Sequence, residues 1–405
     1  MSQPRPRCRL PEDQQVDTYA VRGGQQRTEF EEMTEPIFLT QGFVYDHAAD
    51  AEAAFAGELN RFTYSRYGNP TVSAFEERLR LIEKAPACFA TSSGMSAIYT
   101  TLIPLLRPGA RVVAARALFG TTFTILDTWL KPWGVHTDYV DAHDLDSWRE
   151  ALATPADVVL FESPSNPMQD IVDIPAVSEL AHAAGAQVIV DNVFATPILQ
   201  RPIELGADIV VYSTTKHIDG QGRVVGGAIL GQEEFINGPI AEFIQATGPT
   251  MSAFNAWVLL KGLETLPVRI RAQNAASLEL ATWLENHPAI AQVRYPYLPS
   301  HPQYELAQSL MSGGGSIVTF DLNPDCAPFE VLDALEVIDI SNNLGDVKSM
   351  VTHPATTTHR KLGEEGRKAC GIGNHSVRLS VGLEEVSDLK EDLNRAFGVG
   401  GLPTV

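Results

Sequence analysis

A lysine stands at the end of an apolar run in the middle of this 405-residue chain. The run Ile209 to Tyr212 predicts a buried strand, and three hydroxyl residues and then Lys216 follow it. An ammonium group at the end of a buried strand must reach a cleft, because complete burial of its charge is too costly. In such a cleft its pKa can fall, and the neutral amine can form a Schiff base with an aldehyde. Lys216 is therefore the candidate catalytic residue.

An aspartate ends the apolar run that precedes this one along the chain. Residues 187–191 predict a second buried strand, and Asp191 is its last residue. A carboxylate and an amine at consecutive strand ends suit pyridoxal phosphate, because the carboxylate keeps the pyridine nitrogen protonated and the amine holds the aldehyde. Taken singly, Lys216 has the alternative of a solvated loop residue and Asp191 that of a helix cap.

Two segments could bind the phosphate of such a cofactor. Residues 91–97 supply hydroxyls and Gly94 before the helical stretch 98–106, so free backbone N–H groups would face an anion. An ordinary N-cap is the alternative there. Tyr64 and Arg66 precede a Gly-Asn-Pro turn and could form a second clamp, an arginine fork with a phenol donor. A polar loop with aromatic packing is the alternative for that segment.

Three further residues could contact the cofactor ring or an amino-acid substrate. Asn166 follows a predicted strand and could donate to the phenolic oxygen of the cofactor, or it could only form an Asx turn. Phe119 could stack on the ring or belong to the core. Arg378 lies inside a predicted strand, and a buried arginine needs a carboxylate such as an amino-acid substrate provides. Each signal is weak alone, but their combined order favours pyridoxal phosphate chemistry.

These residues belong to a pattern of alternating strands and helices. Short buried strands are predicted at 111–115, 157–161, 187–191, 208–213 and 226–230. Helical segments lie between them, such as 174–184, which Gly185 ends. This pattern is typical of a mostly parallel sheet with helices on both faces. Ligands of such sheets bind beyond the carboxyl ends of the strands, where Asp191 and Lys216 stand.

The chain divides into three predicted parts. Residues 1–65 form an N-terminal arm, and its segment 36–39 is so apolar that we expect a neighbouring subunit to contact it. Residues 66–260 form the cofactor-binding large domain. Residues 261–405 form a smaller α+β domain, and a long helix at 255–285 leads into it. Its other predicted elements are strands at 317–322 and 376–381 and a closing helix at 389–397.

Composition excludes several classes of protein. The net charge of −20 and the pI near 4.9 argue against binding to nucleic acid or to anionic lipid. No apolar run is long enough for a membrane span, and no signal peptide is expected. The histidines show no metal-ligand spacing, so no metal is expected. The cysteines show no paired spacing and predict reduced thiols in a cytoplasmic protein; they are Cys8, Cys88, Cys326 and Cys370.

Six motifs along the chain are similar to those of one known family. They are Tyr64 to Pro70, Ser93 to Met95, Ser163 to Pro167, Val190 to Pro197, Ser213 to Lys216 and His353 to Ala355. Over nearly its whole length the chain resembles the Cys/Met-metabolism family of fold-type I pyridoxal phosphate enzymes. The resemblance implies an α/β fold with a mostly parallel, seven-stranded sheet in the large domain and a smaller α+β C-terminal domain. It also implies a homotetramer built from two tight dimers.

The resemblance assigns a role to each candidate residue. It implies that Lys216 holds the cofactor, that Asp191 pairs with its pyridinium nitrogen, and that Arg378 clamps the substrate α-carboxylate. Phe119 and Asn166 would contact the ring, and Asn166 the substrate as well. The implied phosphate ligands are Gly94, Met95, Ser213 and Thr215 of the same subunit, with Tyr64 and Arg66 of the neighbouring subunit.

Departures from the family pattern narrow the expected activity. Phe119 stands where most of the family has tyrosine, so no phenol can move protons there. Thr121 stands where methionine-degrading relatives carry cysteine, which counts against a methionine γ-lyase. Asn343 replaces a usual serine and could contact Lys216 or the substrate. Arg223 could pair with the distal carboxylate of a succinyl group, and a surface arginine or a subunit salt bridge is the alternative.

The expected reaction is γ-replacement in methionine biosynthesis. Sulfide would displace succinate from O-succinylhomoserine and give homocysteine. The alternatives within the family use cysteine in place of sulfide or an acetyl ester in place of the succinyl ester. A dinucleotide-binding oxidoreductase is disfavoured because no GxGxxG follows a first strand. A non-catalytic assembly protein on the same fold is the remaining alternative, and the presence of both Asp191 and Lys216 speaks against it.

Overall fold

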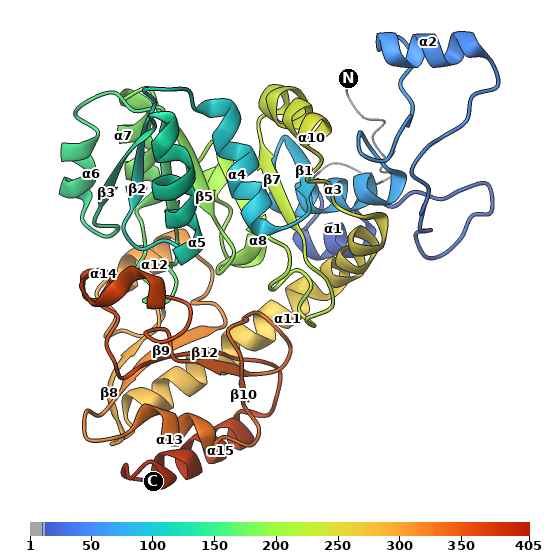
Figure 1. The fold of residues 1–405 in the computed structure, drawn as a ribbon. Coiled ribbons are helices and arrows are strands. Elements are labelled where there is room, and N and C mark those ends of the chain that lie inside the picture. Colours follow the sequence, from blue (N-terminus) through green and yellow to red (C-terminus); the bar gives the residue numbers. More distant parts are fainter. Residues whose placement is uncertain (1–9, 11–12) are drawn as a thin grey trace.

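A large domain, a smaller C-terminal domain and a projecting N-terminal arm make up the chain (Figure 1). The computed structural model describes residue 10 and residues 13–405, so the prediction for Cys8 lies outside the described residues. Within the described part, Cys88, Cys326 and Cys370 are free thiols. No helix of that part combines the length and the apolar character that a bilayer span requires.

A seven-stranded sheet forms the centre of the large domain. Its spatial order is β1 (Ala87–Thr91), β7 (Gly227–Gly231), β6 (Ile209–Ser213), β5 (Gln187–Asp191), β4 (Val158–Glu162), β2 (Arg111–Ala115) and β3 (His136–Val140). In this sheet β7 runs antiparallel to both neighbours and the other pairings are parallel. The sheet is therefore mostly parallel, as predicted. The carboxyl ends of β4, β5 and β6 therefore meet at one edge.

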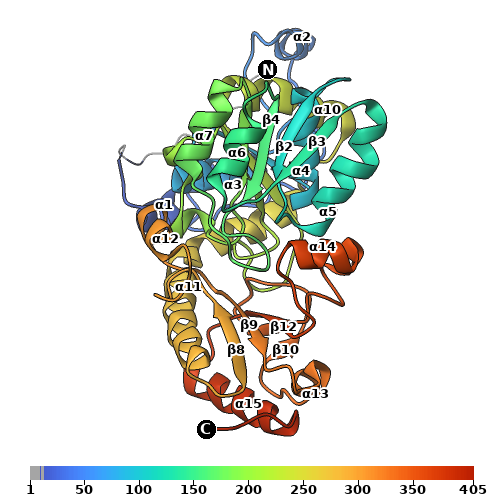
Figure 2. The same ribbon diagram turned by 90° about the vertical axis from the view of Figure 1, so that its left-hand side faces the viewer.

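Helices cover both faces of this sheet, because its central strands are apolar on both sides. Val112 and Ala114 of β2 pack on the side of α4 (Gly94–Leu105), whereas Val113 and Ala115 pack on the opposite side. That opposite side is covered by α6 (Leu145–Ala151) and α7 (Ile174–Ala183), which contribute Trp148 and Val177 to its core. Figure 2 shows the strands between α7 and α6 on one side and α4 and α5 on the other.

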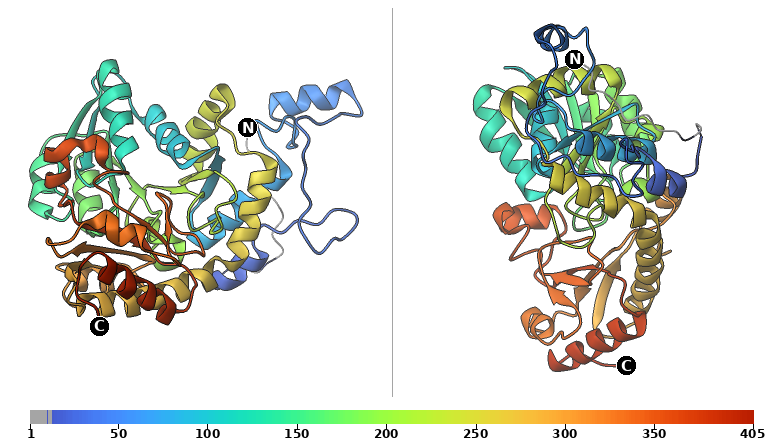
Figure 3. Two further views of the ribbon diagram at one scale, coloured as in Figure 1. Left: turned by 60° about the horizontal axis from the view of Figure 1, so that its bottom comes forward. Right: turned by 90° about the vertical axis from the view of Figure 1, so that its right-hand side faces the viewer.

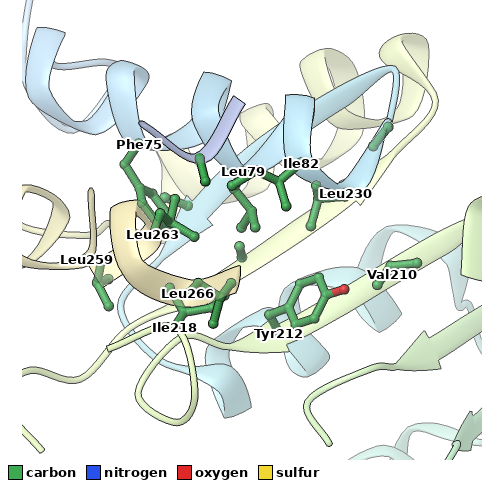
Figure 4. Close-up of a cluster of buried hydrophobic side chains, with 14 of the residues drawn as sticks. Phe75, Leu79, Ile82, Val210, Tyr212, Ile218, Leu230, Leu259, Leu263 and Leu266 are labelled. Atoms are coloured by element: carbon green, nitrogen blue, oxygen red, sulfur yellow. The ribbon is translucent and has the colours of Figure 1, made fainter. Parts of the chain in front are cut away.

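A third core lies where α3 (Pro70–Glu83) meets the long helix α11 (Ala253–Glu285). Asn69 caps α3 by accepting from the Thr71 amide, and Pro70 occupies the first helical position. Phe75, Leu79 and Ile82 of α3 pack against Leu263 and Leu266 of α11 and against Tyr212 of β6 (Figure 4). Complete burial of each such side chain contributes about 1.5–3 kcal/mol.

The C-terminal domain is built on a second sheet. Its spatial order is β10 (Asp339–Ile340), β11 (Met350–Thr352), β12 (Ser376–Ser380), β9 (Ile317–Leu322) and β8 (Ile290–Arg294). Helices α13 (Pro328–Asp333) and α15 (Val386–Val399) supply apolar residues to its core. Helix α11 contributes residues to the cores of both domains, and it runs from one domain to the other (Figure 3). The predicted boundary between residues 260 and 261 falls inside this helix.

Short helices connect these elements. They are α5 (Gly120–Phe123), α8 (Thr196–Leu199), α9 (Glu233–Phe235), α10 (Ala241–Thr247), α12 (Tyr304–Leu310) and α14 (Gly363–Ala369), with π-helical turns at Thr124–Leu130 and Ile236–Ile240 and 3-10 turns at Lys131–Trp133, Pro202–Leu205 and Arg360–Leu362.

The N-terminal arm begins with α1 (Val16–Arg22), whose Tyr19 and Ala20 are buried against the α3 and α11 core. Beyond it the chain leaves the body and carries α2 (Ala48–Ala56) at its far end (Figure 1). Large apolar side chains on this arm face solvent, with Phe30 83% and Val44 89% exposed. The expectation that a partner covers the arm stays a prediction.

Candidate active site

Lys216 lies in the turn that follows β6, at the carboxyl edge of the large sheet. Its Nζ donates to Oδ1 of Asn343 at 2.5 Å, so the amine points toward the C-terminal domain. Burial, and secondarily the nearby Arg378 charge, lowers the pKa of Lys216 to about 8. More of this amine is therefore neutral and nucleophilic near neutral pH than of an ordinary lysine.

Asp191 ends β5, the neighbouring parallel strand, so it lies at the same edge as Lys216. Its Oδ1 accepts from the Val193 amide at 3.1 Å. Burial raises the pKa of Asp191 to about 7, because this one backbone donor does not compensate for the loss of water. A cation placed against it would restore the ionised form, and a protonated pyridine nitrogen is such a cation.

The amino end of α4 provides an anion cradle at this edge. A Cβ on Gly94 would lie 2.5 Å from Cβ of Ser213, so only glycine lets the helix approach the end of β6 this closely. The Ser93 hydroxyl accepts from the Ser96 amide. The first amides of the helix, including that of Met95, carry the positive end of its dipole. Phosphate suits this position.

Thr215 stands one residue before Lys216, in the turn that follows β6. Its hydroxyl donates to the Gly226 carbonyl at 3.2 Å and accepts from the Gly226 amide at 3.1 Å. These two hydrogen bonds fix the turn that carries Lys216. The predicted contact of the Thr215 hydroxyl to the phosphate stays a prediction.

Arg378 on β12 is 2% exposed, and no carboxylate in the described chain pairs with it. Its Nη1 donates to Oδ1 of Asn166 at 3.0 Å, and its Nη2 donates to the carbonyls of Asn342 and Asn343 at 3.1 Å. Its Nε is buried without a hydrogen-bond partner. Burial lowers the pKa of Arg378 to about 10. A buried guanidinium without an anion is the arrangement expected of a carboxylate-binding site.

Phe119 precedes α5, and its backbone amide donates to Oε1 of Glu162 at 2.5 Å. Asn166 follows β4, in a segment with cis peptide bonds before Pro164 and Pro167. The Asn166 carbonyl accepts from Nε2 of His359 at 3.2 Å. The loops after β2 and β4 thus reach the edge that holds Asp191.

Three predicted site residues lie apart from this group. Nε and Nη2 of Arg223 donate to Asp219 at 2.9 Å, and the hydrogen bonds described for this side chain stay within its own loop. The guanidinium of Arg66 lies over the rings of Tyr64 and Tyr67, where the N-terminal arm joins the large domain. The predicted contacts of Tyr64 and Arg66 to the cofactor phosphate, and of Arg223 to the substrate, stay predictions.

Sequence reasoning missed two buried residues at this edge. Glu162 lies in β4 directly beside Asp191, and an acidic residue at the end of an apolar run was the available signal. His217 follows Lys216 and bridges the Val193 carbonyl and the Ser316 hydroxyl, at 3.0 and 2.7 Å. Burial lowers its pKa to about 3, so it is neutral and ties the loop after β5 to the C-terminal domain.

The residues present fit pyridoxal phosphate. The edge combines an amine of lowered pKa, a buried carboxyl group without a cation, a helix amino end closed by Gly94, and the orphaned Nε of Arg378. Lys216 would hold the aldehyde, Asp191 the ring nitrogen, and α4 the phosphate. The described residues contain no cluster of His, Cys, Asp or Glu that could hold a metal ion.

Comparisons with known proteins agree with this geometry. The family described as Cys/Met metabolism PLP-dependent enzyme (PLP, pyridoxal phosphate) matches residues 17–398. O-succinylhomoserine sulfhydrylase of Mycobacterium tuberculosis is 60% identical over 395 residues, which cover 96% of this chain and 97% of that protein. The enzyme of the same name from Pseudomonas aeruginosa is 47% identical over 382 residues, 94% of each chain.

A solved structure shares the fold. The chain matches cystathionine gamma synthase from Xanthomonas oryzae pv. oryzae, in complex with aminoacrylate and cysteine, with a TM-score of 0.91 and 34% identity. The match covers 96% of this chain and 98% of that one.

Proposed function

This chain belongs to the Cys/Met-metabolism family of PLP-dependent enzymes, and on that basis we propose that it replaces the succinyloxy group of O-succinylhomoserine with sulfide, giving homocysteine and succinate. One observation supports an amino-acid substrate above others: Asn343 contacts both Lys216, through its side chain, and Arg378, through its carbonyl. A substrate that offers its carboxylate to Arg378 would therefore lie beside the Lys216 amine.

The bound cofactor supplies an electron sink for the charge that develops on the substrate carbon atoms. The Lys216 amine takes the α-proton and then assists removal of a β-proton. Arg378 binds and orients the α-carboxylate. The Asp191 carboxylate keeps the ring nitrogen protonated. Phe119 can cover the ring, but a phenyl group moves no proton, so proton transfer at the substrate falls to Lys216.

The choice of ester depends in this proposal on Arg223, whose guanidinium would bind the distal carboxylate of the succinyl group. Asp219 already holds its Nε and Nη2, so the succinyl carboxylate must share this arginine with Asp219. Arg223→Ala should reduce the kcat/KM preference for the succinyl over the acetyl ester by about tenfold. The exposed Arg360, changed to Ala, is the control, and an unchanged preference in Arg223→Ala rejects the role.

The assembly proposed is a homotetramer of two tight dimers, in which Tyr64 and Arg66 reach the phosphate site of the neighbouring subunit. Two features of the single chain support it. The arm exposes large apolar side chains such as Val44. A cavity of 440 Å³ opens between the arm and α10, lined in part by Arg66 and Glu242, and a partner segment could fill it.

The location proposed for the protein is the cytoplasm. The free thiols Cys88, Cys326 and Cys370 support it, because disulfides are rare in that compartment.

Steady-state assays with each ester and each thiol test the proposed reaction. We expect the highest kcat/KM with O-succinylhomoserine and sulfide. A preference for cysteine would favour cystathionine synthesis, the activity named for the X. oryzae structure. Lys216→Ala should abolish both turnover and the borohydride-sensitive visible absorbance of the bound cofactor. If the variant keeps both, Lys216 is not the attachment site, and a wild-type protein without that absorbance would favour a non-catalytic role.

A further inference from the structure

Glu162 lies beside Asp191 on the side of the sheet that faces the candidate cofactor site. The two residues are aligned in the parallel pairing of β4 and β5. Aligned residues of neighbouring strands point to the same face and lie about 5 Å apart. Leu160 and Ile189, two positions earlier in each strand, both pack on the α4 side. Glu162 and Asp191 therefore emerge together on that side, where the anion cradle lies.

The carboxyl group of Glu162 also holds the backbone of two other site residues. The Phe119 amide donates to its Oε1 at 2.5 Å, and the Asn166 amide is a further hydrogen-bond donor to it. Glu162 is only 6% exposed, so its loss would leave these amides without an acceptor in a buried place. The Glu162 side chain thus connects the loop of Phe119 and the loop of Asn166 to the edge of the sheet that holds Asp191.

Two buried carboxyl groups this close cannot both be ionised at low cost. Within the described residues, no ion pair is formed by Glu162 or by Asp191, and Lys216, Arg378 and His359 direct their hydrogen bonds to Asn343 and Asn166 instead. Burial, and then the charge of Asp191, raises the pKa of Glu162 far above its ordinary value. A ring cation placed against Asp191 would keep that carboxyl group ionised, so the proton of the pair belongs on Glu162.

We propose that Glu162 is a positioning residue that carries a proton beside Asp191 and fixes the Phe119 amide, so that a single negative charge faces the cofactor ring. A second charge there would bind the ring nitrogen no better and would repel Asp191. The inference depends on the proposed function only for the binding of pyridoxal phosphate. The identity of the ester and of the nucleophile does not enter it.

The protonation state is tested on the holoenzyme without substrate. In Glu162→Gln the amide keeps the shape and neutrality of the protonated acid and can still accept from Phe119. Infrared spectra should show a protonated carboxylic acid band that this variant loses. The pH midpoint of the visible absorbance should move by less than about half a unit. No lost band, or a midpoint shift of about one unit or more, means that Glu162 is ionised and overturns the proposal.

The positioning role is tested by Glu162→Ala, with Glu83→Ala as the matched control. Glu83 is another buried carboxyl group, but it binds Tyr212 on the opposite side of the sheet. Glu162→Ala should raise the cofactor dissociation constant of the apoenzyme about tenfold, since buried amides lose their acceptor. Glu83→Ala should change it by about twofold or less.

Equal effects of the two alanine variants, or unchanged affinity in Glu162→Ala, would overturn the positioning role. If Glu162→Ala does not fold, Glu162→Asp replaces it, because the shorter acid stays neutral but cannot reach the Phe119 amide. All these measurements use the cofactor alone. A failure of the proposed sulfide reaction would therefore leave their outcome intact, whereas a protein that binds no pyridoxal phosphate would overturn both.

Discussion

Lys216 donates its side-chain N–H to the side-chain oxygen of Asn343 across the junction of the two domains, at 2.5 Å. The same asparagine accepts from Arg378 through its backbone carbonyl at 3.1 Å. The C-terminal domain thus places both a neutral acceptor and a cation around an amine that the large domain carries. The cation disfavours protonation of Lys216, and the acceptor favours it, so the position of this loop tunes the nucleophile.

The attachment of pyridoxal phosphate to apoenzyme should follow the titration of Lys216. Its pKa lies near 8, below the ordinary value of a lysine, so the neutral amine forms as the pH rises through 8. The attachment rate, followed by visible absorbance in rapid mixing, should rise with that midpoint. Asn343→Leu removes an acceptor from the ammonium and should lower the midpoint, whereas Asn343→Asp adds a negative charge and should raise it. Shifts in the same direction for both variants would contradict this account.

Arg378→Met should separate substrate binding from stability. The variant loses the carboxylate clamp, so the KM for the amino-acid ester should rise about a hundredfold, while the cofactor absorbance remains. The thermal midpoint of the apoenzyme should fall only slightly, because removal of a buried cation without an anion offsets the loss of its hydrogen bonds to Asn166, Asn342 and Asn343.

Arg269→Met is the matched control for that comparison. Arg269 is also buried, and burial lowers its pKa to about 10, but its donors are satisfied by the carbonyls of His217, Ile218 and Gly262. Its replacement leaves these carbonyls unpaired and should cost about 1–3 kcal/mol of stability. If Arg378→Met is destabilised as much as Arg269→Met, then Arg378 serves the fold more than the substrate.

The main strands were predictable wherever an apolar run was continuous. The strands at 187–191 and 317–322 have the predicted bounds, and the central residues of both are buried. Two strands of the large sheet were missed for different reasons. β1 (Ala87–Thr91) contains two alanines, which have weak strand preference, and β3 (His136–Val140) is an edge strand whose alternate side chains face solvent.

Two consecutive apolar runs that end in Asp191 and just before Lys216 predicted that these residues lie at the same edge of the sheet. The parallel pairing of β5 and β6 confirms this placement. The end of an apolar run could have marked Glu162 as a candidate, but its place beside Asp191 depends on the register of β4 against β5, which no single strand encodes. The contact between Arg223 and Asp219 depends on the shape of a loop. The sequence does not predict the roles of residues such as Glu162 and Arg223, because these roles depend on contacts in space and not on a motif.

Mixed dimers should reveal whether two subunits share a site. Arg66→Ala and Lys216→Ala should each be almost inactive when assembled alone. If Arg66 acts in the neighbouring subunit's site, refolding an equal mixture should restore roughly a quarter of the wild-type activity, because half of the dimers are mixed and each has one intact site. No recovery from the mixture, with recovery of wild-type protein refolded in parallel, would place Arg66 and Lys216 in the same subunit's site.

The anchoring of the arm depends on Glu35, which is 5% exposed and pairs with the fully buried Arg78 and with Lys261. Glu35→Ala leaves the Arg78 charge without its main partner and should lower the free energy of unfolding by about 3–5 kcal/mol at neutral pH. Denaturant unfolding of the apoenzyme measures this loss, and Glu29→Ala, at an exposed position of the same arm, should change it little.

The free energy of unfolding that Glu35→Ala removes should depend on pH, and the sign of this dependence follows from the pKa of Glu35. Burial raises the pKa of Glu35, but the hydrogen bond from Lys261 and the charge of Arg78 outweigh it, and the net pKa is lowered. A carboxyl group with a lowered folded pKa contributes stability above its unfolded pKa and loses it as the pH falls through the folded pKa. The difference between wild type and Glu35→Ala should therefore be full at neutral pH and shrink in acid. A difference that grows in acid would show that Glu35 is not ionised in the folded protein.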